Sequence, residues 1–236
     1  FPVLFPVRLH AGDGVRITTN DTRQMLVTVA PKIDTTRLPS GELFVNVASA
    51  AILNPDQPGA PIQQGIIIPL ALPSPEGNVL EVVSAQYGPP ISAMIAPVPY
   101  MVTDQQGFSV PQYAANPVAY SKAKPDAAPA TLRYVGIARN YHVGQIVVIP
   151  YRFDPATNTI RFLQSATVRV RYNAAAGGIR SAAPVREPFG VGMFANPAAA
   201  AAWAAPVAAP QPFARRNAAS TARAWMRVEV KEDGLY

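Results

Sequence analysis

Between Val15 and Arg171 the chain consists of short apolar runs separated by Pro, Gly, Asn and Asp. Runs of this length with turn residues between them are typical of a β-sandwich or barrel, and none of them has a convincing helical pattern. They predict strands at VRITTN, QMLVTVA, ELFVNVA, GIIIPLAL, VLEVVSAQ, ISAMIAP, LRYVGIAR, GQIVVIPYRF, TIRFL and ATVRVRY. We therefore expect an all-β fold, an antiparallel β-sandwich of the jelly-roll or Ig-like type, over residues 15–173.

A hairpin near the end of this region is the best-defined local prediction. Asp154-Pro155 suits the first positions of a type I turn, and Asn158 tolerates the left-handed conformation that closes such a loop. In the next run, apolar and polar residues alternate, so one face should enter the core and the other should show arginines to solvent. The apolar set is Val168, Val170 and Tyr172, and the polar set is Thr167, Arg169 and Arg171.

The charge of the chain bears on its partners. Lys and Arg total 20 against 14 Asp and Glu, which gives a net charge of +6. A basic surface built from arginine suits an acidic protein face, an anionic glycan or nucleic acid. In the last third of the sandwich only Asp154 opposes a basic set of Arg133, Arg139, Arg152 and Arg161. The Lys-rich loops of a protein that follows a nucleic-acid backbone are missing, so we expect no nucleic-acid partner.

No pattern in the sequence indicates catalysis. The chain has no Cys, and its two histidines, His10 and His142, are far apart in sequence and lack triad neighbours. Phosphate loops and metallopeptidase motifs are missing as well. We therefore expect a chain that is not an enzyme and that uses neither a cofactor nor a metal. One modification motif is present, a candidate glycosylation sequon at Asn20.

Both ends of the chain differ from the sandwich region. Residues 1–14 read as an extended segment at a mature or trimmed start, which suggests an extracellular or cell-surface protein whose signal peptide has been removed. No run is long enough to span a membrane. Residues 174–224 are rich in Ala and Pro and predict an extended, protease-accessible linker, with one short helix at NPAAAAAWAA that starts at Pro197. Arg215, Arg216 and Arg223 in this linker are candidate processing sites.

Residues 225–236 return to strand-like alternation. A strand in this position should open a following domain or complete the sheet of a partner by strand addition. The candidate residues for such an addition are Trp225, Arg227, Val228 and Val230.

The stretch GIARNYHVGQIVVIPYRFDPATNTIRFLQSATVRVRY resembles the closing part of the prodomain of gingipain-type cysteine peptidases. The matching positions are Gly136, Arg139, Gly144, Gln145, Pro150, Asp154-Pro155 and the strand with Val168 and Val170. Upstream, PGAPIQQGIIIPLALPSPEGNVLEVVSAQY is similar to an earlier part of the same prodomain, so the resemblance covers about residues 15–173. Residues 225–236 are similar to the strand that opens the peptidase region in gingipain relatives and type IX secretion sortases.

The resemblance implies a secreted, non-enzymatic prodomain that assists the folding of a cognate peptidase domain and masks its active-site cleft. In the family, a basic side chain from one loop enters the specificity pocket. The matching loop here, residues 98–112, has no Lys or Arg, and Thr103, Asp104 and Gln105 stand near that position. The peptidase therefore prefers another residue, or inhibition is steric, or inhibition has been lost. The alternative is a subunit of an extracellular fibre or surface layer, assembled from identical subunits by β-strand addition.

Overall fold

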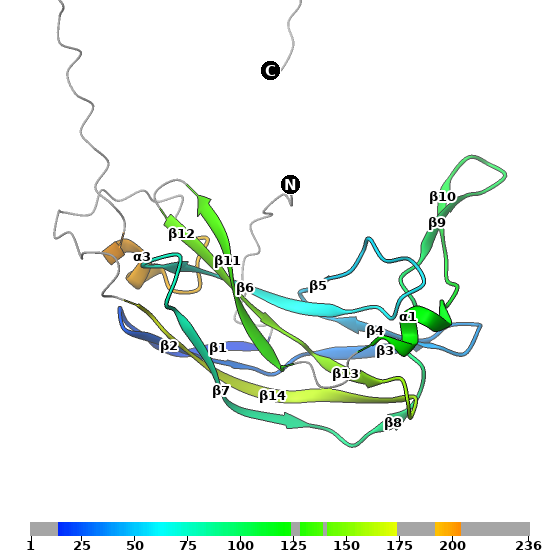
Figure 1. The fold of residues 1–236 in the computed structure, drawn as a ribbon, viewed down its shortest axis with the longest axis horizontal. Coiled ribbons are helices and arrows are strands. Elements are labelled where there is room, and N and C mark those ends of the chain that lie inside the picture. Colours follow the sequence, from blue (N-terminus) through cyan, green and yellow to red (C-terminus); the bar gives the residue numbers. More distant parts are fainter. Residues whose placement is uncertain (1–13, 124–127, 139–140, 174–191, 204–236) are drawn as a thin grey trace, which may run out of the picture. The chain divides into compact units, whose positions relative to one another are not determined.

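The structure is a computed structural model that describes residues 14–123, 128–138, 141–173 and 192–203. A six-stranded antiparallel sheet is organised around β14 (Thr159–Arg171). One edge of β14 pairs with β2 (Gln24–Val29), which carries β1 (Val15–Asn20), and with β13 (Tyr151–Asp154). The other edge pairs with β7 (Val79–Tyr87) and β8 (Ile91–Ser92). The long strand β14 is thus the centre of the first sheet (Figure 1).

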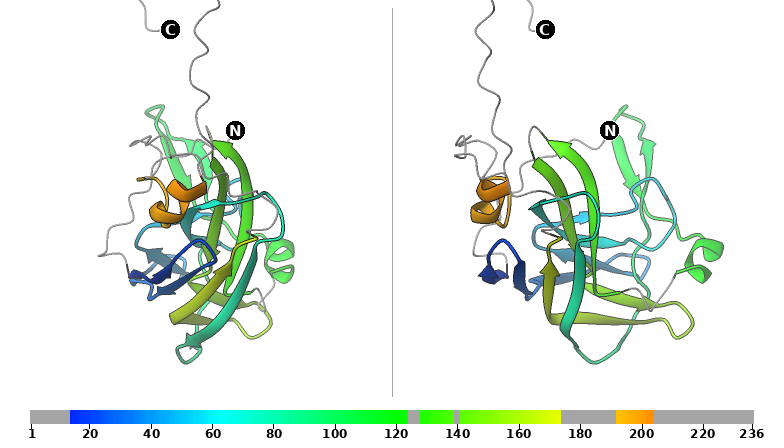
Figure 2. Two further views of the ribbon diagram at one scale, coloured as in Figure 1. Left: turned by 90° about the vertical axis from the view of Figure 1, so that its left-hand side faces the viewer. Right: turned by 60° about the vertical axis from the view of Figure 1, so that its left-hand side comes forward.

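The second sheet has four antiparallel strands in the order β11 (Ala130–Ala138), β12 (Tyr141–Val148), β6 (Gln64–Leu72) and β5 (Ala50–Ile52). Two hairpins complete the β structure: β3 (Ile33–Arg37) with β4 (Leu43–Val47), and β9 (Tyr100–Thr103) with β10 (Ser109–Gln112). The helices are short, α1 at Pro117–Ser121 and α3 at Pro197–Trp203. Figure 2 shows the two layers of strands from the side.

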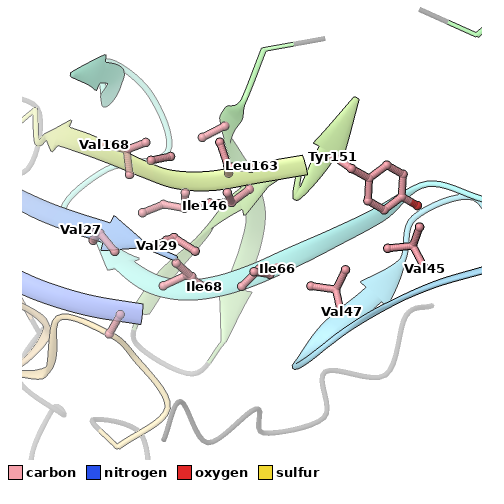
Figure 3. Packing of buried hydrophobic residues seen from close by; sticks show 14 of the residues in the cluster. Val27, Val29, Val45, Val47, Ile66, Ile68, Ile146, Tyr151, Leu163 and Val168 are labelled. Atoms are coloured by element: carbon pink, nitrogen blue, oxygen red, sulfur yellow. The ribbon is translucent and has the colours of Figure 1, made fainter. Parts of the chain in front are cut away.

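The core lies between the two sheets. Strands β2 and β14 contribute Val27, Val29, Leu163 and Val168, and the second sheet contributes Ile66, Ile68 and Ile146. Val45 and Val47 of β4 close the same cluster (Figure 3). All of these side chains are buried, and each contributes about 1.5–3 kcal/mol relative to an exposed position. The predicted antiparallel β-sandwich is confirmed.

Most of the predicted strands are present, but some of their limits differ. The run GQIVVIPYRF divides at Ile149-Pro150, where the chain leaves β12 of one sheet and enters β13 of the other. TIRFL and ATVRVRY are one continuous strand, β14, and only Ile91–Ser92 of ISAMIAP is a strand. Strands β3, β5, β9 and β10 were not predicted. The expectation of no helix in this region is wrong, because α1 lies within it. Asn116 caps this helix by accepting hydrogen bonds from the amides of Val118 and Ala119.

The predicted hairpin between β13 and β14 is confirmed. Asp154 pairs with Thr159, and Asn158 has the left-handed conformation with a φ of 49°. The alternation in β14 is also confirmed, since Val168 and Val170 are fully buried. An acid from an earlier part of the sequence also meets the arginines of β14. Glu81 of β7 lies 3.3 Å from Arg169 and 3.2 Å from Arg171 and neutralises part of this face.

Part of the tail packs against the sandwich. The predicted short helix is confirmed as α3, with Pro197 as its first residue. However, the prediction of an extended, protease-accessible linker is wrong for residues 192–203. Phe194, Asn196 and Ala200 are buried there, and α3 lies against β6.

Candidate functional site

The hairpin β9–β10 brings the predicted site residues together. Its register runs from Tyr100 opposite Gln112 to Thr103 opposite Ser109. The hairpin forms a separate two-stranded sheet that projects beside α1 (Figure 1). Thr103 is the last residue of β9, and Asp104 and Gln105 begin the turn at the tip.

Hydrogen bonds to Asp104 hold the turn at the tip. Its amide donates to the Phe108 carbonyl at 2.9 Å, and its carbonyl accepts from the Gly107 amide at 3.0 Å. The carboxylate oxygen Oδ1 accepts from the amides of Gln106 at 3.0 Å and Phe108 at 2.8 Å. Gly107 closes the loop with a φ of 86°, a conformation that favours glycine. The carboxylate of Asp104 is therefore used within the turn itself.

One face of the hairpin carries an apolar stripe. Side chains alternate between the two faces of a strand, and residues opposite each other in the register share a face. The hydrogen bond between Asp104 and Phe108 extends this pairing to the tip. The stripe therefore consists of Tyr100, Val102, Val110 and Phe108. Phe108, at its outer end, is 68% exposed.

The base of the hairpin is anchored to the sandwich on the β9 side. Val98 is buried and exchanges backbone hydrogen bonds with the loop before β6: its carbonyl accepts from the Gly59 amide at 2.8 Å, and its amide donates to the Ala60 carbonyl at 2.7 Å. Gly59 has a φ of 82°, and a Cβ atom there would lie 2.7 Å from the hydroxyl of Tyr100. The start of β9 thus rests closely on this loop.

On the β10 side the anchor is α1. The Asn116 amide donates to the Gly59 carbonyl at 2.9 Å, so both ends of the hairpin bind the same loop. The hydroxyl of Tyr120 donates to the Ile95 carbonyl at 2.6 Å, and its ring packs edge-on against Phe153 at 5.8 Å between centroids. Burial raises the pKa of Tyr120, so its hydroxyl stays protonated as a donor. The base of the hairpin is therefore bonded to the sandwich, whereas Phe108 near its tip is exposed.

The other candidate residues lie elsewhere. Asn20 ends β1, and its side-chain amide Nδ2 lies 3.4 Å from the Ala195 carbonyl; glycosylation there stays a prediction. The ring of His142 is bonded through Nδ1 to the Tyr134 hydroxyl at 3.0 Å. The remaining candidates are outside the described residues: Arg215, Arg216, Arg223, Trp225, Arg227, Val228 and Val230.

The described residues include no candidate metal-binding cluster. No three His, Asp or Glu side chains gather there in a way that could hold a metal. In the same part of the chain, no helix has the length and hydrophobicity that a membrane-spanning segment needs.

Sequence reasoning missed the β9–β10 hairpin although its signal was present. The runs YMVT and SVPQ flank a loop that contains an Asp and a Gly. Asp104 and Gly107 have the same roles in this turn as Asp154 and Asn158 have in the predicted hairpin between β13 and β14. In both turns an aspartate carboxylate accepts at least one backbone amide, and a residue with positive φ closes the loop. Phe108 was missed because exposure at a tip has no sequence pattern.

Comparison with known proteins places this fold. A family model described as Propeptide_C25 matches residues 46–183. No curated protein matches. A structure from work on the zymogenic latency of gingipain K of Porphyromonas gingivalis is 15% identical, with a TM-score of 0.53 over 70% of this chain and 96% of that chain. The complex of the pro- and mature domains of RgpB of Porphyromonas gingivalis gives 20% identity and a TM-score of 0.55, over 68% of this chain and 84% of that chain.

Both structures share the fold of the chain described above, and the family model spans more than half of the sequence. The chain belongs to the Propeptide_C25 family and is a propeptide of the gingipain type.

Proposed function

We propose that this chain is a non-catalytic prodomain that keeps a gingipain-type cysteine peptidase latent by placing the β9–β10 hairpin over the active-site cleft. The observation that carries the proposal is the hairpin itself, an anchored arm with an exposed aromatic side chain at its tip. The related fold seen in a complex of pro- and mature domains supports a peptidase as the partner.

The chemistry of the hairpin favours steric masking with an apolar anchor. The loop has no Lys or Arg, and the one acid at the tip, Asp104, is bonded to the turn's own amides. Phe108 and Met101 are the most exposed large hydrophobic side chains of the arm, at 68% and 62%. Aromatic side chains that fill a pocket dominate many protein interfaces. The target surface should therefore offer an apolar recess to Phe108 in place of the acidic pocket that a basic residue would need.

The test is an inhibition and binding assay with the full chain and a gingipain-type peptidase from the same source. The chain should form a complex on size exclusion and lower the hydrolysis of a small peptide substrate. Phe108→Ser should raise the inhibition constant by about tenfold or more, the loss expected for an interface anchor. Ile137→Ser on β11 is the matched control, because Ile137 is also 68% exposed.

Two outcomes would count against the proposal. Unchanged hydrolysis with the wild-type chain in excess would remove the masking role. An equal loss of inhibition in the two serine variants would remove the role of the hairpin, since Ile137 lies in the second sheet and not on the arm.

Three further aspects of this function are also proposals. Assistance in folding fits a prodomain whose sandwich has an extensive core of its own, and it would appear as a higher yield of active peptidase when the denatured enzyme is refolded with the chain. An extracellular or cell-surface location follows from the same role. Processing would take place at Arg215, Arg216 or Arg223. The comparisons give no support to the alternative of a fibre subunit.

A further inference from the structure

A segment that follows the sandwich in sequence completes an open edge of its second sheet. Strand β5 pairs with β6 only from Gln64 to Ile66, and none of the described strands pairs with the later part of that edge. There the Ala195 amide donates to the Pro69 carbonyl at 2.8 Å. Asn196 comes next and bonds to Ala71, two residues further along the same edge. We call residues 192–203 the docking segment.

Asn196 pairs with β6 through its side chain in the way that a strand pairs through its backbone. Its oxygen Oδ1 accepts from the Ala71 amide at 2.8 Å, and its Nδ2 donates to the Ala71 carbonyl at 2.9 Å. The same Nδ2 donates to the hydroxyl of Tyr172, also at 2.9 Å. Asn196 is completely buried. Water cannot reach its side-chain amide, so these hydrogen bonds satisfy polar groups that would otherwise be unpaired.

Pro69 limits which segments can pair with this edge of β6, because it offers a backbone carbonyl but no N–H. Residues two apart in a strand direct their backbone groups to the same side. Pro69 and Ala71 therefore both face the docking segment, and the missing N–H of Pro69 falls on this edge and not on the ladder with β12. A partner strand must supply a donor to Pro69 and a paired donor and acceptor to Ala71. Ala195 and Asn196 supply both.

Aromatic contacts flank these hydrogen bonds. Phe194 packs against Tyr141 at 5.2 Å between ring centroids, and Trp203 packs edge-on against Tyr172 at 4.7 Å. Small side chains in α3, Ala199 and Ala200, are buried and allow the helix to approach β6 closely. The docking segment is therefore held at both of its ends as well as at Asn196.

We propose that the edge of β6 from Pro69 to Ala71 is a peptide-binding site for an extended Phe-Ala-Asn segment followed by a short helix, and that it holds the chain's own residues 192–203 even when the backbone before them is cut. A cut between residues 174 and 191 then leaves everything downstream bound to the sandwich. A cut at Arg215, Arg216 or Arg223 leaves the docking segment on the sandwich. This proposal stands on intramolecular contacts and does not require that the chain inhibit a peptidase.

The experiment uses the full chain with a tobacco etch virus protease site inserted between residues 174 and 191. After complete cleavage the two fragments should elute together on size exclusion at micromolar concentration, and native mass spectrometry should show a one-to-one pair. Asn196→Ala should weaken the pair by about tenfold or more, because it removes three buried hydrogen bonds. Asn46→Ala, the same change at an exposed position of β4, should leave the pair intact.

The folding of each variant is checked before cleavage by near-ultraviolet circular dichroism. If Asn196→Ala does not fold, Trp203→Ala takes its place, because it removes a flanking contact and leaves every hydrogen bond of Asn196 in place. The proposal is overturned if the wild-type fragments separate after cleavage. It is equally overturned if the pair formed by the folded variant, whichever of the two is used, is as tight as the wild-type pair, since the binding would then lie outside the docking segment.

Discussion

The turn at the tip of the β9–β10 hairpin should depend on the hydrogen-bond acceptor of Asp104 and not on its charge. Oδ1 accepts from the amides of Gln106 and Phe108. Asp104→Ala removes both bonds, and a half-exposed side-chain acceptor of this kind is worth about 1 kcal/mol, as at a helix N-terminus. A loss of that size reduces the ratio of closed to open turn by about fivefold. Asp104→Asn keeps the acceptor and should keep most of the closed turn.

Amide hydrogen exchange, measured residue by residue by NMR, tests this without any partner. The amides of Gln106 and Phe108 should exchange about fivefold faster in Asp104→Ala and at nearly the wild-type rate in Asp104→Asn. Wild-type exchange in Asp104→Ala would refute the reasoning, because the carboxylate would then not hold the turn. If both variants exchange equally fast, the turn depends on the charge of Asp104 and not on its hydrogen-bond acceptor alone. If Asp104→Ala also inhibits the peptidase less well than Asp104→Asn does, masking depends on a closed turn at the tip.

Two further predictions concern stability. Burial raises the pKa of Tyr151 and of Tyr172. A tyrosine whose pKa is higher in the folded than in the unfolded chain stabilises the fold at pH values below its unfolded pKa of about 10. This stabilisation is lost as the pH rises through the folded pKa. The part of the tyrosinate absorbance that comes from Tyr151 and Tyr172 should therefore appear together with unfolding above about pH 10, and ionisation of these two groups in a chain with native circular dichroism would contradict this. Gly59→Ala should lower the free energy of unfolding in urea by about 1–3 kcal/mol more than Gly41→Ala, because both glycines have positive φ but only Gly59 has the Tyr100 hydroxyl in its way. Equal losses in the two alanine variants would show that the loop before β6 yields to the added methyl group.

The sandwich was predictable because alternation is a local signal. In β2 the buried residues Met25, Val27 and Val29 alternate with partly exposed ones, and β14 has the same alternation from Ala166 to Arg171. The break in GQIVVIPYRF was not predictable, since Pro150 interrupts the run without showing that the next strand joins another sheet. Short elements such as β5, with three residues, are too short for any periodicity.

The docking segment could not be predicted from composition. A run of alanines between prolines has few large side chains, so it reads as a linker. In the structure the same small side chains let α3 lie close to β6. One residue, Asn196, forms with its side chain the two hydrogen bonds to the Ala71 backbone that a neighbouring strand would otherwise form. Nothing in the sequence near Ala71 indicates that its backbone pairs with a side chain and not with a strand. A contact between residues 125 positions apart has no local pattern.

The candidate site was predicted in part. Residues 98–112 were identified through the family resemblance, and the structure gathers Thr103, Asp104 and Gln105 at the tip of one hairpin. Their relative importance was not visible in the sequence. Asp104 stands out in the loop as a lone acid, but its carboxylate is bonded within the turn. Phe108, an ordinary strand residue by pattern, is the most exposed large hydrophobic side chain of the hairpin.

The most direct test of the masking role is photocrosslinking from the tip of the hairpin. The chain, with benzoylphenylalanine in place of Phe108, would be mixed with a gingipain-type peptidase from the same source and irradiated, and the crosslinked peptides identified by mass spectrometry. We predict crosslinks to residues that line the active-site cleft, and none to the cleft when the same group replaces Ile137. Crosslinks to the cleft from position 137 and not from position 108 would show that the prodomain covers the peptidase with its second sheet and would contradict the role given to the hairpin.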